Sequence, residues 1–161
     1  MSILIIYATN YGSTESVAFK LKGKLYDSLT YNVISGDEIN FSLYKTIIIG
    51  TPIRTGKIHP NLKKYLLKHE KELLEKELYL YCLGNMEDSL QNALKQIPES
   101  IKNKLIASKS LGGKIVKKEI SGVDKKIIEM IESKFNMKLD NLNTISNESI
   151  DEFADIIIKN S

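Results

Sequence analysis

Short apolar runs alternate along the chain with longer segments in which apolar residues recur every three or four positions. Continuous apolar runs are typical of strands buried on both faces of a parallel sheet. A recurrence of three to four residues is typical of helices with one buried face. The runs predict five strands, over residues 3–8, 31–35, 45–50, 77–83 and 106–111.

The segments between and after these strands predict five helices, over residues 13–28, 60–75, 88–105, 121–135 and from 146 onward. Pro60 suits a first helical turn, because its missing N–H group would have no helical acceptor there. Pro98 is expected to reset the third helix. Ser121, followed three residues later by Asp124, resembles an N-cap. The buried stripes of the second and last helices are expected to be Leu62, Leu66, Leu67 and Leu74, and Ile150, Phe153, Ala154 and Ile157.

Strands that alternate with helices predict a parallel sheet with helices on both faces, joined by right-handed crossovers. The chain has 161 residues, 42% of them hydrophobic, and no Gly/Ser/Pro-rich linker, so we expect a single domain over residues 1–161. In such sheets, ligands bind beyond the carboxyl ends of the strands. Candidate chemistry is therefore expected in the loops that follow Ala8, Gly50 and Leu83.

The first of these loops, residues 9–14, reads Thr-Asn-Tyr-Gly-Ser-Thr and leads directly into a helix. The N–H groups and the dipole at a helix N-terminus favour a bound phosphate. The loop lacks the lysine of a P-loop and the glycine pattern of a Rossmann fold. Phospho-acceptor domains need acidic residues where this chain has Thr9-Asn10 and Thr51-Pro52. The remaining alternative is an ordinary turn with a Ser/Thr cap.

This loop resembles the phosphate loop of flavodoxins, whose pattern is Thr/Ser-x-Thr-Gly-x-Thr. The resemblance implies a flavodoxin-like, doubly wound three-layer α/β sandwich with a five-stranded parallel sheet in the order 2-1-3-4-5. It also implies that FMN is the cofactor. Side-chain donors to its phosphate would be Thr9, Tyr11, Ser13 and Thr14, while Asn10 and Gly12 would contribute backbone groups.

The second loop is similar to that of the menaquinone-dependent protoporphyrinogen dehydrogenases, which have the flavodoxin fold. Ile53, Arg54, Gly56 and His59 match that family's Gly-Ala-Ser-Ile-Arg-Tyr-Gly-x-x-His stretch. The resemblance implies that Arg54 and His59 are catalytic candidates. Arg54 would stabilise negative charge on the reduced flavin or bind a substrate carboxylate, and His59 would relay a proton. A surface ion pair and a helix-flanking position are the alternatives for these two residues. The flavin ring would lie between this loop and the third one, in contact with Thr51, Pro52, Ile53, Arg54, Thr55, Gly56, Leu83, Gly84, Asn85 and Met86.

Three functions remain open at this point. The leading one is electron transfer through FMN to a redox partner protein. The second is oxidation of protoporphyrinogen IX, with FMN passing electrons to menaquinone in haem biosynthesis. The residues match the first more completely, because Gly84 to Ser108 is shorter than in the dehydrogenases and Thr55 replaces their Tyr. The third is a non-redox module that binds a partner protein and no flavin.

Charge is unevenly spread along the chain, whose net charge is +3. Residues 95–126 carry nine lysines and three acidic residues, which predicts a solvated lysine face or a docking surface for anionic lipid, an acidic protein or a carboxylated substrate. No aromatic ladder accompanies these lysines, so we expect no nucleic-acid partner. One cysteine and two histidines predict no metal site, and Cys82 is expected to be buried. We expect a cytoplasmic protein, with peripheral contact at the inner membrane face through residues 95–126 as an option.

Overall fold

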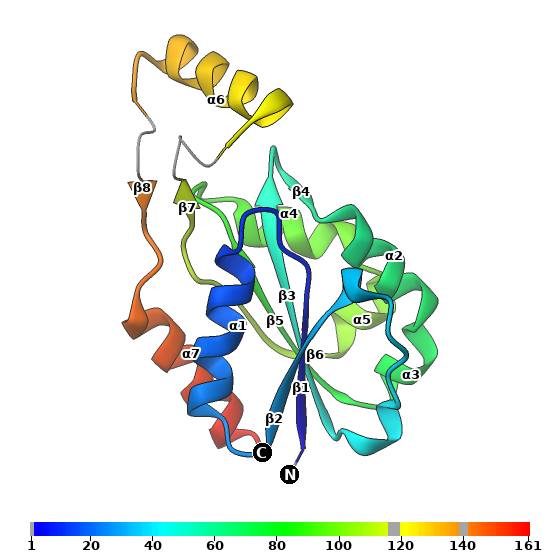
Figure 1. The fold of residues 1–161 in the computed structure, drawn as a ribbon. Coiled ribbons are helices and arrows are strands. Elements are labelled where there is room, and N and C mark those ends of the chain that lie inside the picture. Colours follow the sequence, from blue (N-terminus) through cyan, green and yellow to red (C-terminus); the bar gives the residue numbers. More distant parts are fainter. Residues whose placement is uncertain (1, 116–119, 139–141) are drawn as a thin grey trace.

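A parallel sheet forms the centre of the computed structural model, which describes residues 2–115, 120–138 and 142–161 (Figure 1). Its strands lie side by side in the order β2-β1-β3-β5-β6. They are β1 (Ile3–Tyr7), β2 (Ser28–Asn32), β3 (Thr46–Arg54), β5 (Glu77–Leu83) and β6 (Leu105–Ser110). The predicted fold class is confirmed. The predicted strand order is confirmed as well: β5 and β6 are the fourth and fifth predicted strands, because the prediction did not include the short strand β4, which pairs with the end of β3.

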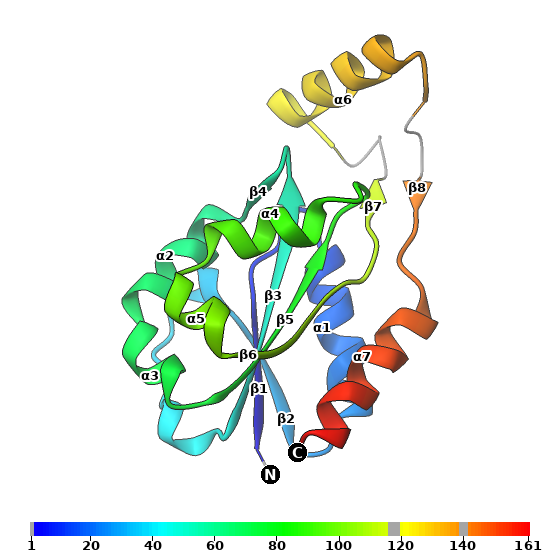
Figure 2. The ribbon, with the colours of Figure 1, turned by 180° about the vertical axis from the view of Figure 1, so that it is seen from behind.

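Helices cover both faces of the sheet and create two separate cores (Figures 1 and 2). One face carries α1 (Ser13–Lys24) and α7 (Asn147–Lys159); the other carries α2 (Pro60–Lys68), α3 (Glu70–Leu74), α4 (Ser89–Gln96) and α5 (Glu99–Lys104). Successive side chains of a strand point to opposite faces. Along β1, Ile3 and Ile5 therefore enter the core beneath α1 and α7, and Leu4 and Ile6 enter the opposite one. Both sets must be apolar, which explains the uninterrupted apolar run.

The first helix and the second strand begin or end three to four residues away from their predicted positions. The helix ends at Lys24 rather than at residue 28, and β2 starts at Ser28 rather than at residue 31. Asp27 turns the chain with a φ of +55°, and the Ser28 hydroxyl donates to Leu25 O at 2.7 Å. Residues Val33–Ser35, predicted as strand, form a 3₁₀ turn in which the Asn32 side chain accepts from Ile34 N at 3.0 Å.

The second predicted loop is mostly a β-hairpin. β3 continues to Arg54 and pairs with β4 (Lys57–Ile58) in antiparallel fashion. Thr55 and Gly56 form its two-residue turn with φ values of +48° and +75°, as the turns favoured by tight hairpins require. The Gln96 side chain of α4 fixes the hairpin, accepting from Ile58 N at 3.1 Å and donating to Gly56 O at 2.7 Å.

The predicted helix over residues 60–75 is divided into α2 and α3 at His69. Pro60 opens α2, and Leu62 and Leu66 are buried as predicted. Leu67 was predicted to be buried, but it is 56% exposed because it lies on the outer side of α2. After the break at His69, Leu73 is buried instead of Leu74, which packs only against the edge of the core.

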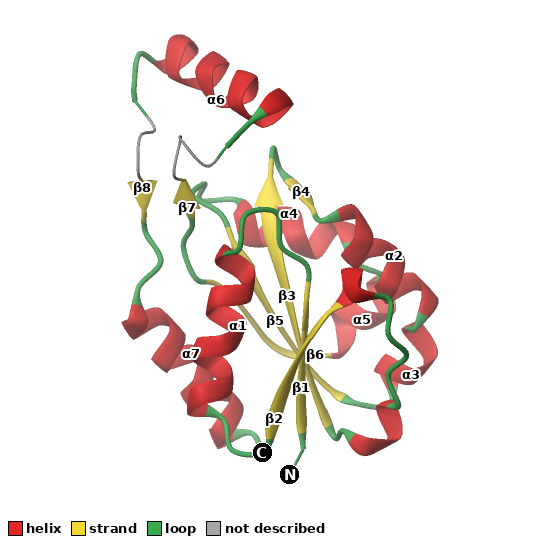
Figure 3. Ribbon diagram, in the orientation of Figure 1, coloured by secondary structure: helices red, strands yellow, loops and turns green. Residues whose placement is uncertain are grey.

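An excursion of the chain, residues 112–145, leaves the sandwich between β6 and α7. It contains the antiparallel pair β7 (Lys114–Ile115) and β8 (Leu142–Asn143), which was not predicted, and the predicted helix α6 (Gly122–Phe135). Helix α6 stands beyond the carboxyl edge of the sheet (Figure 3). None of its residues is buried. The last helix, α7, buries Ile150, Phe153, Ala154 and Ile157 as predicted. Within the described part of the chain, no helix is long and apolar enough to cross a membrane.

Candidate functional site

The loop between β1 and α1 is folded around a glycine. Gly12 has a φ of +94°, a conformation that residues with a Cβ rarely adopt. Its N–H group donates to Thr9 Oγ1 at 2.9 Å, and its carbonyl accepts from Ser16 N at 2.9 Å, which is the first bond of α1. The N–H groups of the residues between them have no acceptor within the helix, as in any first helical turn. The loop thus has the backbone arrangement of an anion site.

Thr14 offers the most specific sign of a ligand in this loop. Its side chain is 1% exposed, yet Oγ1 has no hydrogen-bond partner among the described residues. Its carbonyl accepts from the buried Tyr81 hydroxyl at 2.9 Å. The Tyr81 ring fits only because residue 50 is glycine, where a Cβ would lie 2.3 Å from the ring. A rigid strand therefore holds Thr14 in place while leaving its hydroxyl without a partner, which fits an anionic ligand that accepts from it.

The hairpin after β3 contributes the second group of candidates. Thr51 is buried, and its hydroxyl oxygen accepts from His59 N at 3.1 Å. Pro52 and Ile53 are partly covered, whereas the turn residue Thr55 is exposed. The Arg54 side chain is 48% exposed at the tip of β3. The backbone of the hairpin therefore lies at the same edge of the sheet as the first loop.

Asp124 of α6 joins these two loops. Its Oδ1 forms an ion pair with Arg54 Nε, and its Oδ2 accepts from the Tyr11 hydroxyl. Burial and the Asp124 bond both raise the pKa of Tyr11. Ser121 occupies the N-cap position of α6 as predicted, but its side chain makes no capping bond. Asp124, three residues later, contacts Arg54 and Tyr11 instead. Seventy positions separate Asp124 from Arg54, so no local pattern in the sequence could have indicated this pair.

His59 is buried, and its ring caps α2. Nδ1 accepts from Asn61 N at 3.2 Å, which leaves that nitrogen occupied. Burial lowers the pKa of His59, and the nearby charge of Arg54 lowers it further. Only the neutral ring can accept this bond and cap the helix. The structure therefore places His59 at the helix-flanking position that was the alternative to a proton relay. Cys82 is buried as predicted, and burial raises its pKa to about 11.

The third loop is joined to the excursion. Leu83 is buried, and Gly84 N donates to Gly112 O at 2.9 Å. Asn85 Oδ1 accepts from Thr144 Oγ1 at 2.8 Å, so one of its polar atoms already has a partner. Met86 is 71% exposed, so it is not part of the core. The predicted residues of all three loops therefore lie at one edge of the sheet, as Figure 3 shows.

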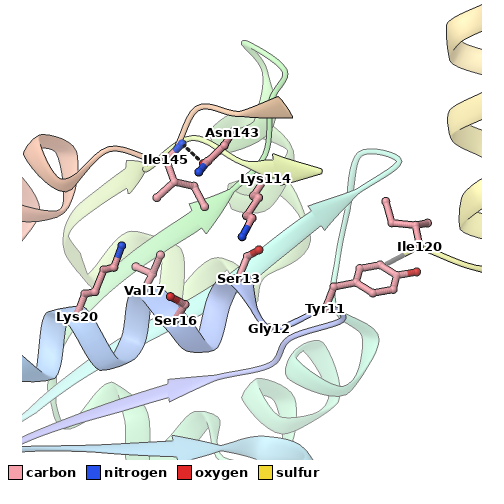
Figure 4. Close-up of a pocket in the computed structure, with 10 residues that line it drawn as sticks. All are labelled: Tyr11, Gly12, Ser13, Ser16, Val17, Lys20, Lys114, Ile120, Asn143 and Ile145. Carbon is pink, nitrogen blue, oxygen red and sulfur yellow. Dashed lines mark hydrogen bonds between the residues drawn. The ribbon is translucent and has the colours of Figure 1, made fainter. Parts of the chain in front are cut away.

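A cavity of about 250 Å³ opens beside the first loop, between α1 and the β7–β8 pair (Figure 4). Its lining combines two lysines, two serines and an asparagine with apolar residues. The lining residues are Tyr11, Gly12, Ser13, Ser16, Val17, Lys20, Lys114, Ile120, Asn143 and Ile145. The sequence placed Lys114 in a basic segment but gave no indication that it would approach α1.

Comparisons with known proteins agree with this architecture. A family model described as flavodoxin domain matches residues 4–141. Oxidised flavodoxin 2 of Bacillus cereus superposes with a TM-score of 0.63 at 18% identity, over 100% of both chains. The flavodoxin of Fusobacterium nucleatum bound to flavin mononucleotide has a TM-score of 0.55 at 21% identity, covering 98% of this chain and 95% of its own.

A flavoprotein of Lactobacillus acidophilus in complex with FMN has a TM-score of 0.57 at 17% identity, covering 68% of this chain and 92% of its own. These likenesses show a common fold. A comparison with curated proteins finds no match.

Proposed function

Because the chain belongs to the flavodoxin-domain family, we propose that it binds FMN and transfers electrons through it. The observation that supports this most is the partnerless, buried hydroxyl of Thr14 on the first turn of α1. When bound, the flavin would supply the redox chemistry, and the protein would set its orientation and potential. Solved structures of the same fold with FMN bound give the proposal further support.

In this proposal, residues 9–14 hold the phosphate through hydroxyl and N–H donors. The hairpin and the third loop flank the ring. Thr51, Pro52, Ile53, Arg54, Thr55, Gly56, Leu83, Gly84, Asn85 and Met86 are the proposed contacts there. Arg54 brings positive charge to this edge, and Asp124 partly neutralises it. The main-chain groups of the Thr55–Gly56 turn can approach a ring closely because Gly56 has no side chain.

The proposal is tested by titrating the flavin-free protein with FMN and with riboflavin, which lacks the phosphate, while recording flavin fluorescence. We expect FMN to bind and riboflavin to bind more weakly. Replacing Thr14 by Val should weaken FMN binding about tenfold or more, because a hydrogen bond to a charged group is lost. The same change should leave the free energy of unfolding unchanged or raise it, since the hydroxyl has no partner in the free protein.

Thr14→Ser is the matched control, because it retains the hydroxyl and should retain FMN affinity. Failure of the wild-type protein to bind FMN would favour the non-redox module. Binding of FMN and riboflavin with equal affinity would exclude residues 9–14 as the phosphate site.

A second candidate function is the oxidation of protoporphyrinogen with a quinone acceptor. The supporting observation is the half-exposed Arg54 beneath a helix that exposes Val123, Met130 and Phe135. The Arg54 guanidinium would bind the carboxylates of a large apolar substrate, and the apolar side chains of the helix would contact its ring system. The exposed lysines Lys125 and Lys126 on the same helix would favour contact with an anionic membrane, where quinones reside.

Anaerobic incubation of the FMN-loaded protein with protoporphyrinogen, with and without menaquinone, tests this candidate through porphyrin fluorescence. Menaquinone-dependent turnover that falls in Arg54→Ala would support it. Absence of turnover in a sample shown by absorbance to hold flavin would leave electron transfer to a partner protein.

A further inference from the structure

The cavity beside α1 places a lysine next to a phosphate loop that contains no basic residue. Residues 9–14 include neither Lys nor Arg. Lys114 of β7 extends towards the Ser13 hydroxyl across the cavity (Figure 4). Ser13 is the first residue of α1 and belongs to the loop itself. The excursion therefore carries a positive charge to the helix end where we propose that the phosphate binds.

Lys114 has no partner in the described part of the chain, whereas the other lysine of the cavity is already engaged. Lys20 Nζ donates to Asn147 Oδ1 at 3.3 Å, at the start of α7. The Lys114 ammonium has no hydrogen-bond or ion-pair partner within residues 2–115, 120–138 and 142–161. An ammonium group beside the Ser13 hydroxyl and a helix N-terminus can form a charge-assisted hydrogen bond to an anion bound there.

The backbone just before Lys114 is fixed in place. Gly113 N donates to Thr144 Oγ1 at 2.9 Å, and Thr144 N donates to Gly113 O at 2.8 Å. Gly112 has a φ of +86°, and a Cβ there would lie 2.3 Å from Thr144 O, so the two chain segments approach closely only with glycine. Gly112 O also accepts from Gly84 N in the third loop. Lys114 therefore extends from a segment that is anchored to the site.

We propose that Lys114 binds the phosphate of FMN, so that the β7–β8 pair completes the phosphate site with the charge that residues 9–14 lack. This inference rests on the proposed function. A phosphate monoester carries close to two negative charges at neutral pH. The helix N-terminus offers about half a positive charge. A lysine at the cavity therefore adds the larger part of the compensation, and its contribution is specific to ligands with a phosphate.

The test compares dissociation constants for FMN and riboflavin in the wild-type protein and in Lys114→Met. We expect the change to weaken FMN binding about tenfold, the effect of losing one charge-assisted hydrogen bond, and to leave riboflavin binding unaltered. Inorganic phosphate should compete with FMN in the wild-type protein and compete less well in the variant. Lys114→Arg should restore most of the FMN affinity.

Lys64→Met is the matched control, because it removes the same charge from an exposed position on α2, on the opposite face of the sheet. It should change neither constant more than about twofold, since exposed charges at a distance are screened by salt. Equal weakening of FMN and riboflavin in Lys114→Met, or no weakening of either, would overturn the inference while FMN binding by the wild-type protein upheld the proposed function. No FMN binding by the wild-type protein would overturn both.

Discussion

Two tyrosines of β5 show how a single hydroxyl acts at this site. Tyr79 and Tyr81 are two positions apart, so both point into the core beneath α1 and α7. Both are fully buried. The Tyr81 hydroxyl donates to Thr14 O, whereas the Tyr79 hydroxyl has no partner among the described residues. The pair separates the effect of burial from the effect of the hydrogen bond.

Tyr81→Phe should lower the free energy of unfolding by about 1 kcal/mol, because one buried hydrogen bond is lost. It should also weaken FMN binding, since the hydrogen bond from the Tyr81 hydroxyl that fixes the Thr14 backbone is lost. Tyr79→Phe should leave stability unchanged or raise it, because it removes an unpaired polar group. Urea denaturation of both variants measures the difference, and equal losses of stability in the two would contradict this role of Tyr81.

His59 should make stability depend on pH. Burial and Arg54 lower the pKa of His59 in the folded protein below the value of 6.5 expected for the unfolded chain. The unfolded chain therefore binds more protons near this pH, and folding is favoured by deprotonation. The stability that neutral His59 contributes is fully present above about pH 6.5 and is lost as the pH falls through the lower, folded pKa.

Replacing His59 by Asn keeps an acceptor for Asn61 N but removes the titration. We expect the variant to lose less stability than the wild-type protein between pH 7.5 and pH 5, because residue 59 no longer takes up a proton. Free energies of unfolding at several pH values measure the difference. Parallel pH profiles for the two proteins would show that His59 does not titrate as described.

Residue by residue, the sequence predicted the local part of the site and missed the long-range part. Thr14 and Gly12 could be identified because their neighbours in sequence form the same loop. Asp124 and Lys114 could not, because their roles depend on where the excursion lies relative to Arg54 and α1. Contacts between segments that are far apart in sequence leave no periodic signal.

Helix α6 depends on few contacts with the rest of the molecule. None of its residues is buried, so apolar packing contributes little to holding it at the edge of the sheet. Asp124 links it both to the hairpin, through Arg54, and to the first loop, through Tyr11. A helix attached in this way should open locally at a modest cost in free energy.

Asp124→Asn should therefore speed amide hydrogen exchange within residues 122–135 about fivefold, the effect of losing a partly exposed ion pair and a charged hydrogen bond. Glu129→Gln on the same helix is the control, and the amides of α7 are the internal reference. Hydrogen exchange followed by mass spectrometry measures both. Unchanged exchange in Asp124→Asn would show that other contacts hold α6.

At the scale of elements, strands buried on both faces were the easiest to predict. β5 agrees with its prediction at both ends because every residue after Glu77 is apolar or aromatic and buried. β2 does not, because it is an edge strand in which Leu29 is exposed and Tyr31 is buried. The hairpin was missed since Thr55 adopts a positive φ that its side chain does not favour.

For the whole molecule, the order of strands brings three separate loops to one edge. β1 lies between β2 and β3, so the chain leaves β1 and β3 on opposite faces of the sheet, and a ligand site forms where the connections diverge. The alternation of strands and helices predicted a parallel sheet with helices on both faces, whereas the order of its strands was predicted from the resemblance of the first loop to that of flavodoxins. The excursion over residues 112–145 was not predictable as a unit, because its strands have only two residues each.

The central claim is that FMN binds at this edge with its phosphate on residues 9–14. Amide chemical shifts of the nitrogen-15-labelled protein, recorded by NMR during an FMN titration, test it most directly. We expect the largest shifts at residues 9–15, with further shifts at 51–56 and 83–86, and little change at Asp27, Lys45 and Lys76 at the opposite edge. Shifts centred on the opposite edge, or no shift at saturating FMN, would contradict the account.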